Sequence, residues 1–454
     1  MTIALTVALA VCCGPQDPSS ADSPWPQFRG PRADGTLARI EHPQAWGEEE
    51  NIAWSVEVPG AGWSSPVVVG DRLFLTTAVD PDGAAPSAFA AGARAMGGQG
   101  GGSKRPAGPI HYEVRCHDLT DGGRRWTTQV GENRPEHAVH ASNTYATESP
   151  ATDGERIFAT FGGLGEVVAL SLEGEVQWRS TTGVFPTSNN FGWGSSLTVF
   201  DGLVFFQNDN ETESFLLAFD AETGDVRWRA DRTKGTSWAT PTVLHSGERA
   251  QLVTCGAGVV EAYAPQTGEA LWTLTNVGKS FSASPAADAE QVYVGYSSQM
   301  GSGPLIAVRG NASGAHELER RQDPEIVAWR NDRGGPSFPS IITAGGCVYS
   351  IGTMGVFACY DRETGDRLYR QRLPDSSMVV ATPWADDERI FVLDESGKTF
   401  VIRAGEEYEL LGVNELPGLY WATPSVAGDR LLLRSAERLT CVRAGGPAAG
   451  RGPI

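Results

Sequence analysis

Apolar residues along this chain occur in short runs separated by turns rich in glycine, aspartate and threonine. The stretch from Phe215 to Pro241 shows the pattern, with an apolar run, an acidic turn at Thr223 and Gly224, a second run carrying Trp228, and a Trp-Ala-Thr-Pro end. Short apolar runs between turn signals, without a helical period, predict β-strands.

Both parts of this stretch recur along the chain, and such self-similarity indicates a repeat architecture. An aromatic residue follows a turn glycine by four positions in five places, which are Trp126, Trp178, Trp228, Trp272 and Tyr369. Small residues precede a proline, or a serine in the third copy, in eight places that begin at Ser64, Glu148, Gly194, Ala239, Ala283, Ser337, Ala381 and Ala422. From the second copy onward the spacing is roughly 45 residues, the size of one four-stranded propeller blade. The fold class predicted is all-β, an eight-bladed β-propeller of four-stranded antiparallel blades.

The two ends of the repeat array complete one another. The last unit, 425–443, contains three strands, and residues 51–58 form a strand carrying Trp54 without a blade of its own. We therefore expect the N-terminal strand to complete the last blade and close the ring, which removes exposed sheet edges. The domains expected are a signal peptide at 1–18, an extension at 19–50, the propeller at 51–446 and a tail at 447–454. An insertion at 81–109, rich in Ala, Gly and Ser, is expected to be a disordered loop.

Composition and the N-terminus bear on localisation. The net charge of −19 and the pI near 4.8 argue against nucleic acid or an anionic membrane as partner. No apolar run has the length of a transmembrane helix, and Ile3 to Val11 is a short apolar stretch typical of a secretory signal. Leu9–Ala10–Val11–Cys12 resembles a bacterial lipobox, so Cys12 is a candidate for lipidation, with Cys13 or ordinary cleavage as alternatives.

The repeat resembles a known family. The pattern formed by Ala218, Asp220, Thr223, Gly224 and Trp228 is similar to the tryptophan-docking repeat of PQQ-like propellers, which include the quinoprotein dehydrogenases and the outer-membrane assembly lipoprotein BamB. The opening WPQFRGP, residues 25–31, resembles the start of secreted PQQ-like repeat proteins. The resemblance covers 25–443 and implies the fold more strongly than any chemistry, because one fold supports many functions.

Four tryptophans lie three residues before the proline position, where innermost strands begin beside the channel mouth. These are Trp63, Trp193, Trp238 and Trp421. They predict either an aromatic-rimmed funnel for a flat ligand or a peptide, or a capping layer over the strand ends. The tryptophans of the outer strands are interpreted as structural wedges between blades.

Glu148 is the one carboxylate among small residues at its repeat position, and His137, His140 and Asn143 precede it. A buried carboxylate needs a partner. The quinoprotein dehydrogenases hold calcium with Glu, Asn and Asp near the ring axis, so the resemblance implies a cation site that includes Glu148. The alternative is a carboxylate bonded to backbone amides or an arginine. The two histidines have no evident third ligand for a metal.

Catalytic signals of the quinoproteins are few. Those enzymes typically carry adjacent cysteines above the quinone, and the adjacent pair here, Cys12 and Cys13, lies in the signal. We expect a non-catalytic, monomeric scaffold for envelope protein partners, in the periplasm or on the outer membrane, without cofactor. The alternatives are a PQQ- and calcium-dependent alcohol or sugar dehydrogenase, and a small-ligand-binding propeller.

Cys347 and Cys359 are equidistant from Thr353 in the sixth blade. A tight turn centred on Thr353 would place them directly opposite one another, and an exported protein could oxidise them to a disulfide. The alternative is a pair of small buried side chains.

Overall fold

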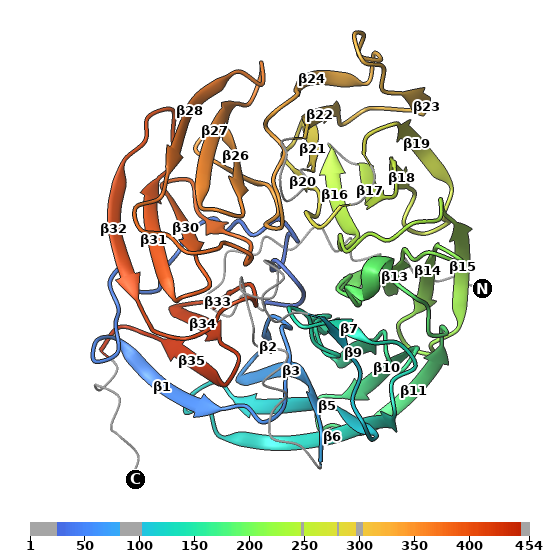
Figure 1. The fold of residues 1–454 in the computed structure, drawn as a ribbon, viewed down its shortest axis with the longest axis vertical. Helices are drawn as coiled ribbons and strands as arrows, with labels where there is room; N and C mark the ends of the chain where they lie inside the picture. The colour runs from blue at the N-terminus through green and yellow to red at the C-terminus, as the bar shows by residue number, and fades with distance from the viewer. Residues whose placement is uncertain (1–24, 82–101, 247–248, 279–280, 297–302, 446–454) are drawn as a thin grey trace, which may run out of the picture.

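The computed structural model describes residues 25–81, 102–246, 249–278, 281–296 and 303–445. These residues form a ring of eight antiparallel blades around a central channel, as predicted (Figure 1). Within the described part of the chain the only helical element is the single turn η1, Ser188–Asn190. No helix there has the length and apolar character that crossing a membrane requires.

Each blade runs from an innermost strand at the channel to an outermost strand at the rim. Blade 1 contains β2 (Val67–Val69), β3 (Arg72–Val79), β5 (Ile110–Asp118) and β6 (Arg124–Asn133). Blade 2 contains β8 (Ala151–Thr152), β9 (Arg156–Phe161), β10 (Glu166–Ser171) and β11 (Val176–Thr181). Blade 3 contains β12 (Thr198–Phe200), β13 (Leu203–Asn208), β14 (Phe215–Asp220) and β15 (Val226–Asp231). Blade 4 contains β16 (Thr242–Ser246), β17 (Arg249–Gly256), β18 (Val259–Tyr263) and β19 (Ala270–Thr275), with β23 (Gly314–Glu317) added outside.

The second half of the ring repeats this order. Blade 5 contains β20 (Ala286–Ala287), β21 (Gln291–Gly295), β22 (Leu305–Arg309) and β24 (Val327–Asn331). Blade 6 contains β25 (Ile342–Ala344), β26 (Cys347–Gly352), β27 (Val356–Asp361) and β28 (Arg367–Arg372). Blade 7 contains β29 (Trp384–Ala385), β30 (Arg389–Leu393), β31 (Lys398–Arg403) and β32 (Leu410–Glu415). Blade 8 contains β33 (Ser425–Ala427), β34 (Arg430–Arg434), β35 (Arg438–Val442) and β1 (Ile52–Glu57).

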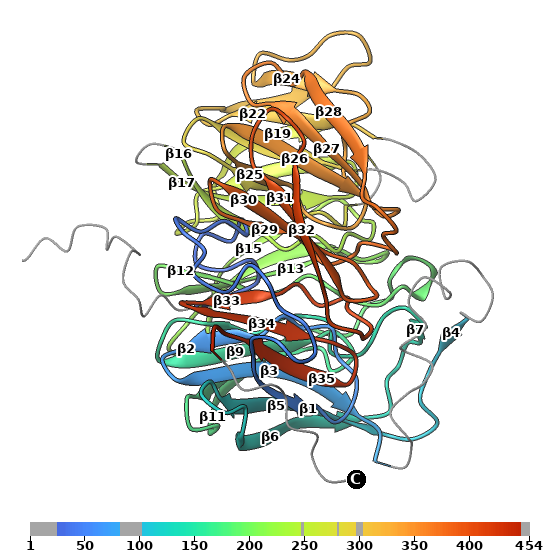
Figure 2. The same ribbon diagram turned by 90° about the vertical axis from the view of Figure 1, so that its left-hand side faces the viewer.

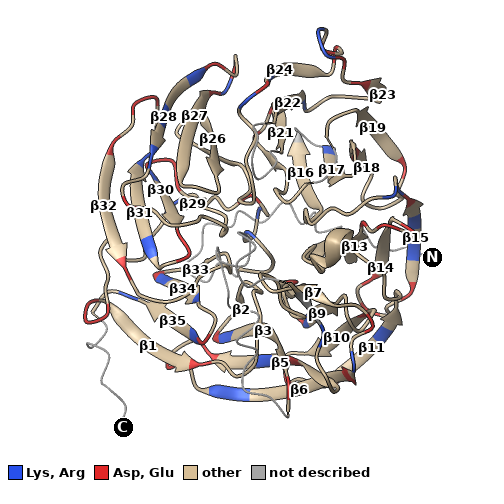
Figure 3. Cartoon of the chain, viewed as in Figure 1, with Lys and Arg blue, Asp and Glu red and all other residues tan. Residues whose placement is uncertain are grey.

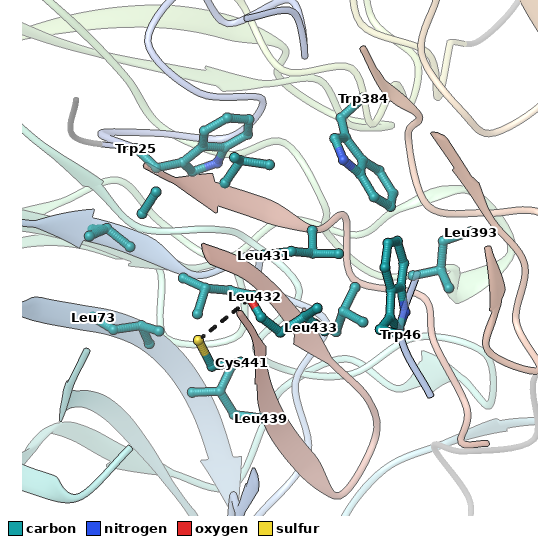
Figure 4. Close-up of a cluster of buried hydrophobic side chains, with 14 of the residues drawn as sticks. Trp25, Trp46, Leu73, Trp384, Leu393, Leu431, Leu432, Leu433, Leu439 and Cys441 are labelled. Carbon is teal, nitrogen blue, oxygen red and sulfur yellow. Dashed lines mark hydrogen bonds between the residues drawn. The ribbon is translucent and has the colours of Figure 1, made fainter. Parts of the chain in front are cut away.

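The predicted ring closure is confirmed. Strand β1 pairs antiparallel with β35, with Trp54 opposite Cys441 and Val56 opposite Leu439. The hydrophobic cluster behind this seam joins blades 1, 7 and 8 to the N-terminal extension (Figure 4). The chain ends are thus held in one core, which hides two strand edges from solvent.

The outer-strand tryptophans lock neighbouring blades together. Trp54 donates its indole N–H to the carbonyl of Leu119 in blade 1, at 3.1 Å, and its ring lies against Gly122. A Cβ on Gly122 would come within 2.5 Å of that ring, and the residue has φ +75°, so glycine is required there twice over. Trp126, Trp178, Trp228 and Trp329 each donate in the same way to the next blade.

Blade 4 departs from this rule. Trp272 bonds Gln251 of its own blade instead of the next blade. Strand β23 pairs in parallel with β19 and places Gly314 beside Trp272. The ring of Trp272 is 1% exposed, because β23, in the connection between β22 and β24, lies where a turn glycine of the next blade lies elsewhere.

The insertion in blade 1 is not a loop throughout. Strand β4 (Ser103–Lys104) pairs with β7 (Val139–His140) beside the ring (Figure 2), which corrects the expectation of disorder for the end of 81–109. Residues 82–101 lie outside the described part of the chain, as do the expected signal at 1–18 with Cys12 and the tail at 447–454.

The N-terminal extension crosses the face of the ring opposite to η1 (Figures 1 and 2). Trp25 pairs with Val68 of blade 1, and Thr36 with Ala385 of blade 7. Between them Arg29, 1% exposed, donates to the carbonyls of Pro285 and Ile341 at 2.6 and 2.8 Å, in blades 5 and 6. Burial lowers the pKa of Arg29 to about 10, so its guanidinium stays charged at neutral pH. The WPQFRGP segment therefore closes the channel at this face.

The prediction for Cys347 and Cys359 is wrong in register. Cys359 lies opposite Tyr349, and Cys347 lies opposite Asp361, because the β26–β27 turn is centred one residue later, at Met354. The cysteines are thus diagonal neighbours, and both are free thiols in the structure. A hydrogen bond from the Cys359 thiol lowers the pKa of Cys347. The disulfide itself stays a prediction.

Candidate functional site: the central funnel

A cavity of about 440 Å³ opens along the ring axis at the face that carries η1. Phe28 of the extension lies at its inner end, and the innermost strands and the loops before them form its wall. We call it the central funnel, and its wall consists of Phe28, Trp63, Ser65, Ser142, Asn143, Thr147, Ser149, Ser188, Asn189, Phe191, Trp193, Gly194, Ser196, Trp238, Thr240, Ser282, Ser284, Tyr296, Ser337, Phe338, Ser340, Val380, Thr382, Trp421 and Thr423.

The structure brings the four predicted tryptophans together in this wall, along with Asn143. Each indole N–H is held by a protein acceptor: Ser142 O for Trp63, Phe185 O for Trp193, Gly192 O for Trp238 and Glu395 Oε2 for Trp421. Because these bonds run from the ring edges, the orientation of each indole is fixed by the protein. Asn143 supports the same wall by donating to the carbonyls of Phe191 and Trp193.

A ring of hydroxyl groups below the tryptophans was not predicted. The eight members are Ser65, Ser149, Ser196, Thr240, Ser284, Ser340, Thr382 and Thr423. From Ser65 to Thr382, each backbone N–H donates to the hydroxyl oxygen of the next member at 2.9 to 3.1 Å. These bonds tie every pair of neighbouring blades from the first to the eighth. In the sequence, the signal for the hydroxyl ring was the Ser or Thr that directly precedes most of the repeated prolines.

In two of the eight places where small residues precede a proline or serine, the predicted alignment of the repeat is wrong. The third copy was read as Gly194–Ser195–Ser196 with Ser196 in the proline position, but Ser196 occupies the hydroxyl position. In the sixth copy Ser340 takes the hydroxyl position, two residues after Phe338. The hydroxyl, and not the proline, defines the repeat position here, because the bonds between blades run to the hydroxyl oxygen.

The series of bonds in the hydroxyl ring is interrupted between blade 8 and blade 1, at Ser65. Ser65 is 1% exposed, and its Oγ has no hydrogen-bond partner among the described residues. A buried hydroxyl without a partner carries a free-energy cost of about 1–3 kcal/mol. The wall of the funnel thus contains one buried polar atom whose hydrogen-bonding capacity is not used within the described structure.

Glu148 does not line the funnel. It faces a separate cavity of about 20 Å³, which Gln207 and Asp209 also line. Its carboxylate accepts the backbone N–H of Gly162 at 2.9 Å, in agreement with the simpler of the two interpretations. Burial raises the pKa of Glu148 to about 7, and hydrogen bonds from backbone amides only partly offset this.

The other carboxylate in this small cavity is already neutralised. Asp209 receives the guanidinium of Arg232 at 2.8 and 3.2 Å, with both side chains fully buried, and Gln207 donates to it as well. A cavity of about 20 Å³ holds one water molecule. The Oε1 atom of Gln207 is buried without a partner in the described structure, so such a water has an acceptor to satisfy.

The two histidines beside Glu148 are separately engaged. The Nδ1 of His140 lies 2.8 Å from the hydroxyl of Ser142, and the Nε2 of His137 lies 3.9 Å from a carboxylate oxygen of Glu136. Within the described ranges no three His, Cys, Asp or Glu side chains are grouped as metal ligands.

The family model described as outer membrane protein assembly factor BamB matches residues 111–275 and 317–407, which is more than half of the chain. The chain belongs to the BamB family. The resemblance predicted from the tryptophan-docking repeat is thereby confirmed.

Relatives of this BamB-family chain differ in activity. Polyvinylalcohol dehydrogenase of Pseudomonas sp. is 26% identical over 408 residues, covering 70% of this chain and 62% of the relative. The chain therefore spans less than two thirds of the length of that relative. BamB of Moraxella catarrhalis matches at 14% identity and TM-score 0.56, over 85% of this chain and 97% of that structure. Quinohemoprotein alcohol dehydrogenase of Comamonas testosteroni matches at 12% identity and TM-score 0.59, over 96% and 83%. At these identities the two structures show a shared fold.

The residues of this BamB-family funnel do not fit PQQ with calcium. PQQ carries three carboxylates, and calcium binds through anionic oxygens, yet among the described residues no Asp, Glu, Lys, Arg or His lines the funnel. The nearby set of Glu148, Asn208 and Asp209 faces a space the size of one water, and Arg232 already pairs with Asp209. The side chains present offer neither countercharge for the quinone nor a free carboxylate pair for the ion.

Proposed function

We propose that this protein is a non-catalytic propeller of the bacterial cell envelope that serves as a scaffold for other envelope proteins. The observation that carries the proposal is the uncharged wall of the central funnel. A quinone cofactor bound on the ring axis needs cationic and metal partners there, and transferring its unpaired charges from water is costly. The described wall of this funnel supplies aromatic, hydroxyl and amide groups, together with the aliphatic side chain of Val380.

Two further points support the scaffold over a dehydrogenase. The match to the BamB structure spans nearly the whole of that protein, whereas the curated dehydrogenase is much longer than the matching part of this chain. The rim of the propeller carries both acidic and basic positions (Figure 3), and the net charge of −19 disfavours nucleic acid as a partner.

The proposal includes export to the periplasm, with an outer-membrane anchor at Cys12 and a monomeric propeller. It rests on the apolar N-terminal stretch, the lipobox-like sequence and the family. Labelling of the intact protein with a radioactive fatty acid, in wild type and Cys12→Ser, tests the anchor. Loss of label in the variant supports it, and equal or absent labelling in both overturns it.

The decisive test of the non-catalytic role is an absorption titration of the full-length protein with PQQ and Ca²⁺, combined with a dye-linked alcohol oxidation assay. We expect no stoichiometric, calcium-dependent change in the quinone spectrum and no dye reduction. Saturable PQQ binding with oxidation of an alcohol would replace the scaffold by the dehydrogenase alternative. Cross-linking of envelope proteins in cells, followed by mass spectrometry, then identifies partners, and recovery of the propeller alone would count against a scaffold.

A further inference from the structure

The central funnel combines fixed aromatic rings with unused hydroxyl donors. The four funnel tryptophans, Trp63, Trp193, Trp238 and Trp421, all donate their indole N–H to protein acceptors. They can therefore contact a ligand only through the surface of their rings. The rings of Trp63 and Trp421 lie 5.9 Å apart at 31°, and together they form a continuous aromatic wall between blades 1 and 8. Such rings contact apolar faces of a ligand at low cost, because their own positions are already fixed.

The hydroxyl ring supplies the opposite chemistry. Seven of its eight oxygens accept a backbone N–H from the neighbouring blade, and each hydroxyl keeps its own proton for a further bond. None of these hydroxyls donates to another described residue. The eighth, Ser65, has neither donor nor acceptor in the described structure, although it is almost fully buried. The narrow end of the funnel is therefore lined by a circle of hydroxyl groups, each of which keeps a proton to donate and a lone pair to accept, the pairing that the hydroxyl groups of a ligand require.

Charge narrows the class of ligand. The described wall lacks ionisable carboxylates, ammonium, guanidinium and imidazole groups, so an ionic ligand would lose its hydration without compensation. The volume of about 440 Å³ falls in the range of about 300–1,000 Å³ typical of small-ligand sites. A suitable ligand is neutral, rich in acceptor oxygens, and has apolar faces that can lie on indole rings.

We propose that the central funnel binds the end of a neutral oligosaccharide. A pyranose ring has a C–H face that packs on indole and a periphery of hydroxyl and ether oxygens that accept from serine and threonine. A peptide fits less well, because its backbone presents no flat C–H face that can lie on an indole ring. This inference goes beyond the scaffold role and does not depend on it, since it concerns the funnel and not the rim.

The test uses the full-length protein and the probes cellohexaose, maltohexaose and N,N′-acetylated chitohexaose, with hexagalacturonate as anionic control and a Gly-Ser-Ala decapeptide as peptide control. Binding is followed by intrinsic tryptophan fluorescence and by calorimetry. We expect at least one neutral hexaose to bind saturably, and hexagalacturonate and the peptide to bind much more weakly. Absence of binding by all three neutral hexaoses, or equal binding of the anionic control, overturns the proposal. Preference for the peptide does so as well and indicates a peptide site.

Variants localise the binding. Trp238→Ala is expected to weaken the hexaose about tenfold, as for a well-packed aromatic contact, and Trp238→Phe to restore most of the affinity. The matched control is Trp228→Ala, which removes another half-buried tryptophan, from the outer strand of blade 3, and should leave affinity unchanged. Ser284→Ala tests the hydroxyl ring without removing an aromatic ring. Melting temperatures check that each variant is folded, and equal losses in Trp238→Ala and Trp228→Ala would refute the location.

The outcome is separable from that of the scaffold proposal. PQQ binding and dye reduction would overturn the non-catalytic role whatever the hexaoses do. Failure of all hexaoses would leave the partner and PQQ experiments unaffected.

Discussion

At the scale of single residues, the tryptophans of the outer strands illustrate what repetition in a sequence can establish. Their packing role was predictable because one residue type returns at one position of each blade, and the indole-to-carbonyl bonds agree with it. The exception at Trp272 was not predictable, because strand β23 reaches it from a loop of the next blade.

Replacement of Trp54 by alanine is expected to lower the free energy of unfolding by about 3–5 kcal/mol, the range for emptying a large aromatic site. The indole is 8% exposed and bridges blades 8 and 1. Chemical denaturation followed by circular dichroism measures the change. Val413→Ala, on the outer strand of blade 7 and 45% exposed, is the control and should change stability by less than about 0.5 kcal/mol.

Glu148 gives a prediction about pH. Its pKa is raised in the folded protein to about 7 from 4.5, so the folded state binds the proton more tightly than the unfolded state. The contribution of protonated Glu148 to the free energy of unfolding is complete below pH 4.5. It is lost as the pH rises through 7, a change on the order of 3 kcal/mol. Glu148→Gln keeps the shape and removes the titration. We expect the stability difference between variant and wild type to shift in favour of the variant between pH 5 and 8; a difference that stays constant with pH would contradict it.

At the scale of elements, the N-terminal extension depends on a neutral histidine. His42 is 2% exposed, and its Nε2 accepts the indole N–H of Trp384 in blade 7 at 3.1 Å. Because an indole can only donate, Nε2 is unprotonated and Nδ1 carries the proton towards the Pro43 carbonyl. Burial lowers the pKa of His42 to about 4 from 6.5.

The extension should therefore loosen in acid. Because the pKa of His42 is lower in the folded than in the unfolded state, the stabilisation by neutral His42 is complete above pH 6.5. It is lost as the pH falls through 4. Melting temperatures of wild type and His42→Gln between pH 4 and 8 measure this. The variant is expected to be less stable at pH 8 and to approach wild type near pH 4, and parallel curves for the two proteins would refute the assignment.

The elements also show where prediction from the sequence failed. The strands and the closure of blade 8 were predictable from hydrophobic runs and from two incomplete units. Registers were not: moving the β26–β27 turn centre from Thr353 to Met354 changes the partner of Cys359 from Cys347 to Tyr349. A one-residue uncertainty in a turn leaves hydrophobicity unchanged and alters every cross-strand pair. The rim tryptophans were found for the funnel, but the hydroxyl ring and Ser65 were missed, since serine and threonine are common in any loop.

At the scale of the whole molecule, the ring should depend on its closing strand. Deleting all residues up to Val58 removes β1 and the segment that closes the channel, and exposes the edge of β35. We expect aggregation or a large fall in melting temperature, measured by light scattering and calorimetry. Deleting residues 83–100 is the control and should be mild.

Val56→Pro separates strand pairing from loss of the extension. The backbone N–H of Val58 donates to the Glu437 carbonyl, so the N–H of Val56, two residues earlier and opposite Leu439, is directed at β35 as well. Proline at this position removes a backbone donor from the β1–β35 pair while the extension stays in place. A melting temperature equal to that of wild type, with the protein monomeric, would contradict the dependence on closure.

Ring closure has a consequence in time. Ser55 meets Thr440 across 385 residues of sequence, and Arg29 bonds Ile341 across 312. At a translation rate on the order of 10 residues per second, the first strand waits roughly 40 s before its partner has been made. The nascent chain thus carries an unpaired edge through nearly all of its synthesis and cannot complete its fold until the end. A chain that completes its fold so late leaves this strand edge open to pairing with other chains throughout its synthesis.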